Sequence, residues 1–244
     1  MRLIRTLLPA LVALLAVAPA AAQDGRDICF RGVSAANAQD LDVAIAKYDE
    51  CEQSAGLSGN GLRNLYTFRA EAYVRKGDFA MALADHDRAI ALDPNNAYAY
   101  LRRGSVYLQV HDDAAALADF DRAVALEPDN SRHYVYRGAV LVSLGQRERG
   151  AEDFSRAIEL EPSLAEAYYR RGLVRLSQGD RPAALDDLSF AALHLPTRAE
   201  VVRQAQELVK ALGQDPGPAD GRLGANTRTA LEAWRKDRGL VFIE

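Results

Sequence analysis

The sequence predicts an all-α fold: an α-solenoid of helix-turn-helix repeats followed by a small helical C-terminal segment. The main observation is that several residue types recur at intervals of 34 positions over most of the chain. The recurring residues are the glycines Gly104, Gly138 and Gly172, the prolines Pro94, Pro128, Pro162 and Pro196, the alanines Ala89, Ala123, Ala157 and Ala191, and the tyrosines Tyr66, Tyr100, Tyr134 and Tyr168. The second observation is that each interval contains two stretches with helical periodicity.

The composition is that of a soluble folded chain, because 49% of the 244 residues are apolar and 26% are charged. A formal net charge of −4 argues against non-specific binding of nucleic acid. The two cysteines and four histidines are scattered, which leaves little material for a zinc, haem or iron–sulfur site. We therefore expect no cofactor, no metal and no nucleic-acid partner.

Residues 1–22 have the three-part pattern of a secretory signal peptide. Arg2 and Arg5 give a positive start, an apolar run covers residues 7–18, and small residues precede Gln23. A transmembrane anchor is the alternative, but the apolar run is shorter than the roughly 20 residues that a bilayer span requires. We expect a periplasmic or secreted (bacterial) protein with no membrane span after signal cleavage.

Residues 97–130 illustrate how one repeat forms a helical hairpin. One helical face carries Tyr100, Arg103, Gly104 and Tyr107, and a second face carries Ala116, Phe120, Ala123 and Leu126. Small residues on both faces allow the two helix backbones to approach closely. Asp112 is expected to cap the second helix and Pro128 to end it. In the other units a glycine stands in the turn between the helices, where this unit has His111.

This pattern resembles the tetratricopeptide repeat, which has an aromatic, a small residue, a tyrosine, an alanine, an aromatic, an alanine and a proline in order. The residues that match are Tyr100, Gly104, Tyr107, Ala116, Phe120, Ala123 and Pro128. The resemblance covers residues 63–198 as four repeats, 63–96, 97–130, 131–164 and 165–198, and it implies a right-handed superhelix. The departures from the family pattern are Ala70, His86, Gly150, Arg175 and Leu188. None of them conflicts with the fold.

Residues 23–62 are interpreted as a degenerate N-terminal repeat, because Gly32, Ala44 and Tyr48 keep the spacing of the later units. The turn of this unit is expected near residues 39–40. Cys29 and Cys51 lie at nearly equal distances from that turn, so they should face each other across the hairpin. An oxidising compartment then favours a disulfide between them, and two buried thiols are the alternative.

Arginines and aspartates also recur once per unit. They are Arg69, Arg103, Arg137 and Arg171, and Asp85, Asp119, Asp153 and Asp187. The hairpin should bring each arginine close to the aspartate of its own unit. We expect a structural ladder of ion pairs, each contributing about 0–1 kcal/mol if exposed. The strict periodicity argues against catalytic carboxylates, since an active site needs one unique constellation.

The resemblance implies that the first helix of each repeat lines a concave groove. By position, the groove residues are Asn64, Thr67, Phe68, Tyr98, Leu101, Arg102, Ser105, Arg132, Val135, Tyr136, Tyr169 and Arg170. Tyrosine and arginine dominate the energetics of protein interfaces, and arginine pairs well with carboxylates. We therefore expect a protein or peptide partner, an extended segment with acidic groups. A simply solvated face is the alternative.

After Pro196 the 34-residue pattern stops, and two helical stripes flank a loop rich in glycine and proline. Residues 199–244 resemble a truncated peptidoglycan-binding domain of cell-wall proteins. The residues that carry this resemblance are Leu208, Leu212, Gly213, Gly217, Asp220, Gly221, Gly224, Thr227, Ala230, Trp234, Gly239 and Leu240. The resemblance implies peptidoglycan as a second partner.

The glycan-binding-like loop would consist of Asp220, Gly221, Arg222 and Gly224. The alternative is that the segment is a cap, because the end of a solenoid exposes an apolar face that a following helix usually covers. We expect the glycines and Asp220 to shape the loop, and Trp234 to be part of the core, since it shares a helical face with apolar residues.

The sequence contains no nucleophile motif, no phosphate-binding glycine loop and no pair of histidines at metal-binding spacing. We therefore expect that the protein is not an enzyme. The predicted function is a protein–protein interaction scaffold, an adaptor whose repeats hold a partner while the C-terminal segment tethers it to the cell wall. An accessory regulator of a cell-wall hydrolase is the alternative function.

Overall fold

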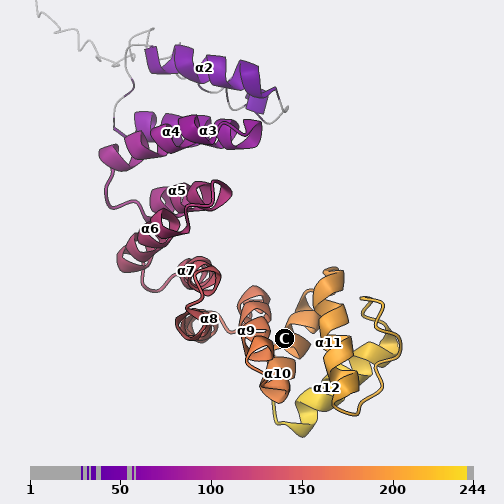
Figure 1. Cartoon of the computed structure of the whole chain (residues 1–244). Coiled ribbons are helices and arrows are strands. Elements are labelled where there is room, and N and C mark those ends of the chain that lie inside the picture. Colours follow the sequence, from indigo (N-terminus) through magenta and orange to yellow (C-terminus); the bar gives the residue numbers. More distant parts are fainter. Residues whose placement is uncertain are drawn as a thin grey trace, which may run out of the picture.

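The computed structural model describes residues 29, 32, 34–36, 40–53, 57 and 59–240. Every regular element in these residues is a helix, and the helices stack in chain order along a curved path (Figure 1). They are α2 (Leu41–Gln53), α3 (Asn60–Lys76), α4 (Phe79–Leu92), α5 (Ala97–Gln109), α6 (Asp113–Leu126), α7 (Ser131–Ser143), α8 (Arg147–Leu160), α9 (Ala165–Ser177), α10 (Arg181–His194), α11 (Ala199–Ala211) and α12 (Ala225–Asp237). The predicted all-α solenoid is confirmed. The expected signal peptide, residues 1–22, lies outside the described residues.

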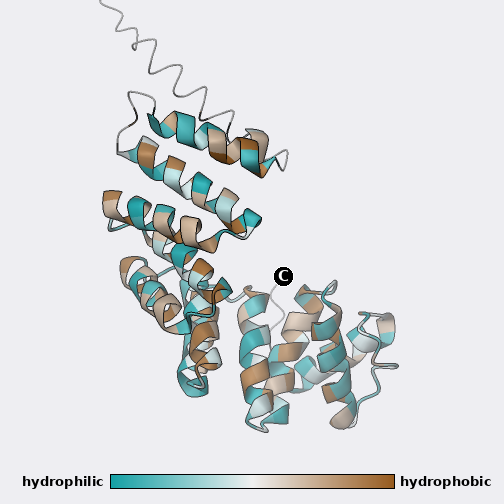
Figure 2. Cartoon of the chain, turned by 45° about the horizontal axis from the view of Figure 1, so that its top comes forward, coloured by the Kyte–Doolittle hydropathy of each residue, from teal (hydrophilic) through white to brown (hydrophobic). Residues whose placement is uncertain are grey.

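Several helices begin at a residue whose side chain caps them. The side chain of Asp112 accepts a hydrogen bond from the amide of Ala115, and Asp78 and Asp180 cap the starts of α4 and α10 in the same way. His111 has a φ of 61°, the left-handed conformation that glycines adopt in the other turns. Hydrophobic and hydrophilic residues alternate along the helices, as amphipathic helices in a stack require (Figure 2).

Each repeat packs one residue of its first helix against one large side chain of its second. A Cβ atom on Gly104 would lie 2.7 Å from the ring of Phe120, so only glycine fits there. The same relation joins Gly138 to Phe154, Gly172 to Leu188 and Gly32 to Tyr48, with distances of 2.8–2.9 Å. The repeat 63–96 departs at both positions at once, because it has Ala70 and the smaller ring of His86, both buried. The predicted core position of His86 is present in the structure.

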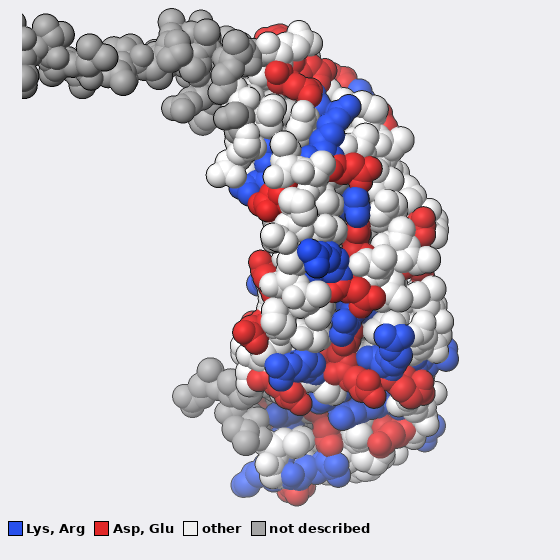
Figure 3. Space-filling model, turned by 90° about the vertical axis from the view of Figure 1, so that its left-hand side faces the viewer, with Lys and Arg blue, Asp and Glu red and all other residues white. Residues whose placement is uncertain are grey.

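The periodic arginines and aspartates form paired contacts within every repeat. Each arginine donates through Nε and Nη2 to both oxygens of its aspartate, and the pairs are Arg69–Asp85, Arg103–Asp119, Arg137–Asp153 and Arg171–Asp187. The aspartates are buried, so the energetics of exposed ion pairs do not apply to them. The arginines also reach the preceding repeat, for example Arg137 to Asp121 at 3.1 Å. Oppositely charged side chains therefore alternate along the stack (Figure 3).

At the N-terminal end, a disulfide joins Cys29 and Cys51, whose Cα atoms are 5.3 Å apart. Cys51 is fully buried beside Tyr48, Ala44 and Leu65. The bond therefore links α2 to residues that precede it in the terminal repeat, which among the described residues packs against the repeat 63–96.

The C-terminal segment continues the solenoid rather than leaving it. Helix α11 occupies residues 199–211, which is 34 positions after α9 at 165–177. Helix α11 therefore keeps the spacing of the repeat, although the pattern of recurring residues stops after Pro196. Its glycine marker is absent because Gln206 stands 34 positions after Gly172. A common apolar core holds α10, α11 and α12 together, with Leu188, Val202 and Leu231 at its centre.

Candidate functional site

The structure forms a cavity of about 350 Å³ between α7 and α9, which we name the cationic cavity. Its lining residues are Arg132, Val135, Tyr136, Ala139, Leu164, Glu166, Arg170 and Arg198. Three of the seven principal predicted groove residues, Arg132, Tyr136 and Arg170, therefore come together. Arg132 and Tyr136 lie one turn apart on α7. Arg170 lies on α9, which begins 34 positions later and is the equivalent helix of the next repeat. The stack is visibly hollowed along one side (Figure 3).

The charges in the cationic cavity do not balance. Glu166 is the only carboxylate among its lining residues, and it is shared by Arg170, whose Nε lies 2.7 Å away, and by Arg198. The guanidinium group of Arg132 makes no ion pair with any described residue. Three guanidinium groups thus face one carboxylate. A lining with this excess of positive charge favours a negatively charged partner group.

The other predicted groove residues lie outside this cavity. Phe68 on α3 and Tyr98 on α5 are 44% and 49% exposed. Arg102 on α5 pairs with Glu71 at 3.0 Å, and its guanidinium carbon lies 5.8 Å from the centre of the Tyr98 ring. Its charge is therefore balanced within the chain. Partial burial raises the pKa of Tyr98 above its ordinary value. This part of the predicted groove is aromatic rather than cationic.

Tyr169 does not line the cationic cavity, although its neighbour in the sequence does. Sequence reasoning missed Glu166 and Arg198. Both could have been found by extending the 34-residue alignment. Glu166 stands 34 positions after Arg132, and Arg198 immediately precedes the helix that begins 34 positions after α9.

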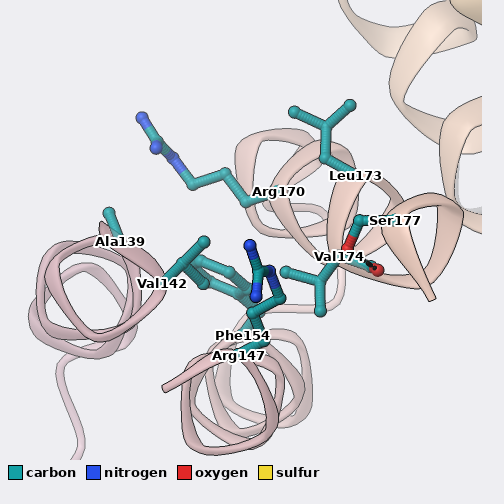
Figure 4. A pocket seen from close by; sticks show the side chains of 8 residues that line it. All are labelled: Ala139, Val142, Arg147, Phe154, Arg170, Leu173, Val174 and Ser177. Atoms are coloured by element: carbon teal, nitrogen blue, oxygen red, sulfur yellow. Dashed lines mark hydrogen bonds between the residues drawn. The ribbon is translucent and has the colours of Figure 1, made fainter. Parts of the chain in front are cut away.

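A second cavity of about 190 Å³ adjoins the first, and we name it the apolar cavity. It shares Ala139 and Arg170 with the cationic cavity, and its other lining residues are Val142, Arg147, Phe154, Leu173, Val174 and Ser177. Figure 4 shows side chains of α7 and α9 facing each other, with Phe154 of α8 between them. None of the residues that line only this cavity was predicted from the sequence, since nearly all of them look like ordinary core positions.

The predicted glycan-binding-like loop borders a cavity of about 370 Å³, lined in part by Asp220, Arg222 and Gly224. Gly221 does not line it. Its amide donates to Oε1 of Gln206 at 2.9 Å, and a Cβ atom there would lie 2.7 Å from the carbonyl oxygen of Ala199. Close approach of the backbone therefore requires glycine at this position.

The buried side chain of Gln206 organises this loop from below. Its amide nitrogen donates to the side chain of Asp220, the carbonyl of Arg222 and the hydroxyl of Thr227, at 3.2, 3.1 and 2.9 Å. The backbone amide of Arg222 also donates to Asp220 and lowers the pKa of that carboxyl. Asp220 thus shapes the loop, as the sequence indicates, and it also lines the cavity.

Helix α12 is docked on the last repeat. The indole nitrogen of Trp234 donates to Asp186 of α10 at 3.0 Å, and Arg238 pairs with the same carboxylate at 2.5 Å. Arg235 is 4% exposed and donates to the carbonyl of Asp186 and the hydroxyl of Ser189. Trp234 is partly buried against the core that α10, α11 and α12 share. Its place is that of a packing residue.

Two further findings concern the described residues as a whole. Among them, no group of three or more His, Cys, Asp and Glu side chains is arranged to hold a metal ion. In the same part of the chain, no helix has both the length and the apolar character needed to cross a membrane.

Comparisons with known proteins agree with this architecture. Two family models described as tetratricopeptide repeat match residues 70–133 and 137–192, and a peptidoglycan binding domain model matches residues 198–242. The Protein SGT1 homolog of Oryza sativa subsp. japonica is 34% identical over 65 residues, which are 27% of this chain and 17% of that protein.

Solved structures show the same fold at low sequence identity. A crystal structure of MamA superposes with a TM-score of 0.61 and 24% identity, covering 69% of this chain and 96% of that chain. YrrB, described as a TPR protein with an unusual peptide-binding site, has a TM-score of 0.59 and 21% identity, covering 72% of this chain and 89% of that chain. The solenoid is thus built of tetratricopeptide repeats, and the last segment matches a wall-binding family.

Proposed function

We propose that this tetratricopeptide-repeat protein is a protein–protein interaction scaffold that binds an acidic segment of a partner in the cationic cavity. The observation that carries the proposal is the excess of guanidinium groups there, above all that of Arg132, which has no carboxylate within the described residues. Arginine side chains bind carboxylates through paired hydrogen bonds. The peptide-binding site named for YrrB, a protein of the same fold, supports a peptide as the ligand.

Fluorescence anisotropy with two labelled pentapeptides tests this proposal. A Glu-Glu-Ala-Glu-Glu peptide is expected to bind more tightly than a Lys-Lys-Ala-Lys-Lys peptide. Arg132→Glu should abolish the preference, because it reverses the charge of the unpaired guanidinium. Arg149→Glu is the matched control, since Arg149 lies on α8 outside both cavities and its substitution changes the net charge equally. Equal loss of binding in both variants would mean that overall charge, not this cavity, attracts the peptide.

The second proposed function is attachment to the cell wall through residues 198–242. The match to the peptidoglycan binding domain family and the polar cavity beside Asp220 and Arg222 support it. Sedimentation with purified peptidoglycan tests it on the full chain. Arg222→Ala with Asn226→Ala should reduce the pelleted fraction, because both side chains line that cavity. If the variant pellets as much as the parent chain, the loop does not bind the wall.

We further propose that the protein functions in the periplasm or is secreted. The pattern of residues 1–22 and the disulfide between Cys29 and Cys51 support this location, because disulfides persist mainly in oxidising compartments. Fusing residues 1–30 to a reporter that is active only outside the bacterial cytosol tests it. An inactive reporter would contradict the proposed export.

A further inference from the structure

The apolar cavity is a defect in an otherwise regular repeat. Its floor is the ring of Phe154, which is 1% exposed, and Val142 and Leu173 stand on opposite walls (Figure 4). In the preceding repeat the corresponding ring is Phe120, and Tyr136 stacks over it with ring centres 5.7 Å apart. The residue 34 positions after Tyr136 is Arg170, which has no ring. The space that an aromatic ring fills at one junction is therefore empty at the next.

The rim of this cavity also differs from the equivalent rim one repeat earlier. There, Ser143 donates to Asp113 at 2.5 Å and links α7 to α6. Here, Ser177 donates to the carbonyl of Val174 in its own helix, and Arg147 stands at the position of Asp113. Arg147 makes no ion pair with any described residue. The rim is thus open and carries a positive charge that no described residue neutralises.

The volume suits one side chain. A dry cavity of about 150 Å³ lined by apolar residues can hold a benzene molecule, so 190 Å³ accommodates a phenyl ring. Stacked or tilted ring contacts strengthen binding beyond what the burial of apolar area contributes. Because the apolar and cationic cavities share Ala139 and Arg170, a chain that lies in one can place its next side chain in the other.

We propose that the apolar cavity is the specificity pocket of the scaffold, and that it receives an aromatic side chain of the partner that is directly flanked by acidic residues. The partner's ring stacks on Phe154 in the same way that Tyr136 stacks on Phe120. The neighbouring carboxylates meet Arg147 on one side and the cationic cavity on the other. This inference rests on the proposed binding of an acidic partner segment.

The test compares labelled Glu-Glu-Phe-Glu-Glu and Glu-Glu-Ala-Glu-Glu peptides by fluorescence anisotropy. The parent chain should bind the phenylalanine peptide at least tenfold more tightly, since the ring buries apolar area and stacks. Ser177→Phe introduces a phenyl ring at the apolar cavity, so that the peptide's ring can no longer enter it. The affinities for the two peptides should then lie within twofold of each other, while the alanine peptide still binds. Arg147→Glu should weaken the binding of both peptides.

Matched controls come from the same positions of other repeats. Gln109→Phe introduces a ring at the position equivalent to Ser177 on α5, and Arg181→Glu reverses a charge at the position equivalent to Arg147 on α10. Both should keep the tenfold preference, and circular dichroism should show an unchanged melting temperature for every variant used.

The outcomes separate the two proposals. Equal affinities of the parent chain for the two peptides would overturn the specificity pocket and leave the acidic-segment proposal standing. A preference for phenylalanine that survives Ser177→Phe would also overturn it, because the ring would then bind elsewhere. If neither acidic peptide binds better than a Lys-Lys-Phe-Lys-Lys peptide, both proposals fail.

Discussion

Replacing Gly104 by alanine is expected to destabilise the protein, although alanine is the better helix former. In the interior of α5 the substitution gains about 1 kcal/mol of helix propensity. The new Cβ atom, however, would lie 2.7 Å from the ring of Phe120, which is fully buried and cannot move away. Overpacking of this kind costs about 1–3 kcal/mol. The expected net effect is a loss of up to about 2 kcal/mol in the free energy of unfolding.

The repeat 63–96 shows how the clash can be relieved. It has Ala70 and His86 at the two positions, and the smaller five-membered ring leaves room for the methyl group. Introducing Phe120→His together with Gly104→Ala copies that pair. The double variant should therefore be more stable at pH 8 than the sum of the two single effects predicts, with a favourable coupling of about 1 kcal/mol or more.

Urea unfolding followed by circular dichroism at 222 nm, for the parent chain, both single variants and the double variant, measures this coupling. Ser105→Ala on the same helix is the control, because it raises helix propensity at a side chain whose hydroxyl donates to Leu101 of its own helix, and it should not destabilise. If Gly104→Ala proves as stable as the parent, the close packing at this glycine does not limit the side chain. Additive effects in the double variant would refute the proposed complementarity of ring and methyl group.

Three further outcomes are expected. Burial lowers the pKa of His86 in the folded chain from 6.5 to about 4. Between pH 6.5 and pH 4 this histidine is therefore protonated in the unfolded chain but not in the folded one. About 3 kcal/mol of stability should be lost as the pH falls through this range. Urea titrations at pH 7 and pH 4.5 check this loss, which should be absent when His86→Phe is combined with Ala70→Gly. Asp119→Ala should cost about 3 kcal/mol because it leaves Nε and Nη2 of Arg103 without acceptors, and only Nη1 keeps its contact with Asp87. Arg103→Met with Asp119→Leu should recover most of that loss in thermal melts. Gly221→Ala should lower the melting temperature by several degrees, because its Cβ has no room beside the backbone of α11, and an unchanged melting temperature would show that the loop can move away.

The local structure could be predicted from the sequence wherever the contacts of a residue lie within its own repeat. Helix ends followed from caps such as Asp112, and the left-handed turn at His111 followed from its place in the repeat. The pairing of Arg137 with Asp153 and of Cys29 with Cys51 followed from the geometry of a helical hairpin. In each case two partners lie within one repeat, so spacing alone determines which residues meet.

The site could be predicted only in part, because its cavities depend on how neighbouring repeats pack. Position along the helix indicates that Arg132 and Tyr136 face the same side, but it does not show that Arg198 joins them or that Glu166 binds two arginines. The continuation of the repeat into α11 was hidden because Gln206 replaces the marker glycine.

The sequence by itself determined the repeat, its helices and the contacts inside each hairpin, since these follow from residue spacing and from the short range of backbone hydrogen bonds. Only the tertiary structure decided where the stack leaves space. Whether a ring covers Phe154 depends on Arg170 in the next repeat, and so on the relative placement of helices that are far apart along the chain. A cavity is volume between packed helices that no side chain occupies, and that volume exists only once the helices have docked.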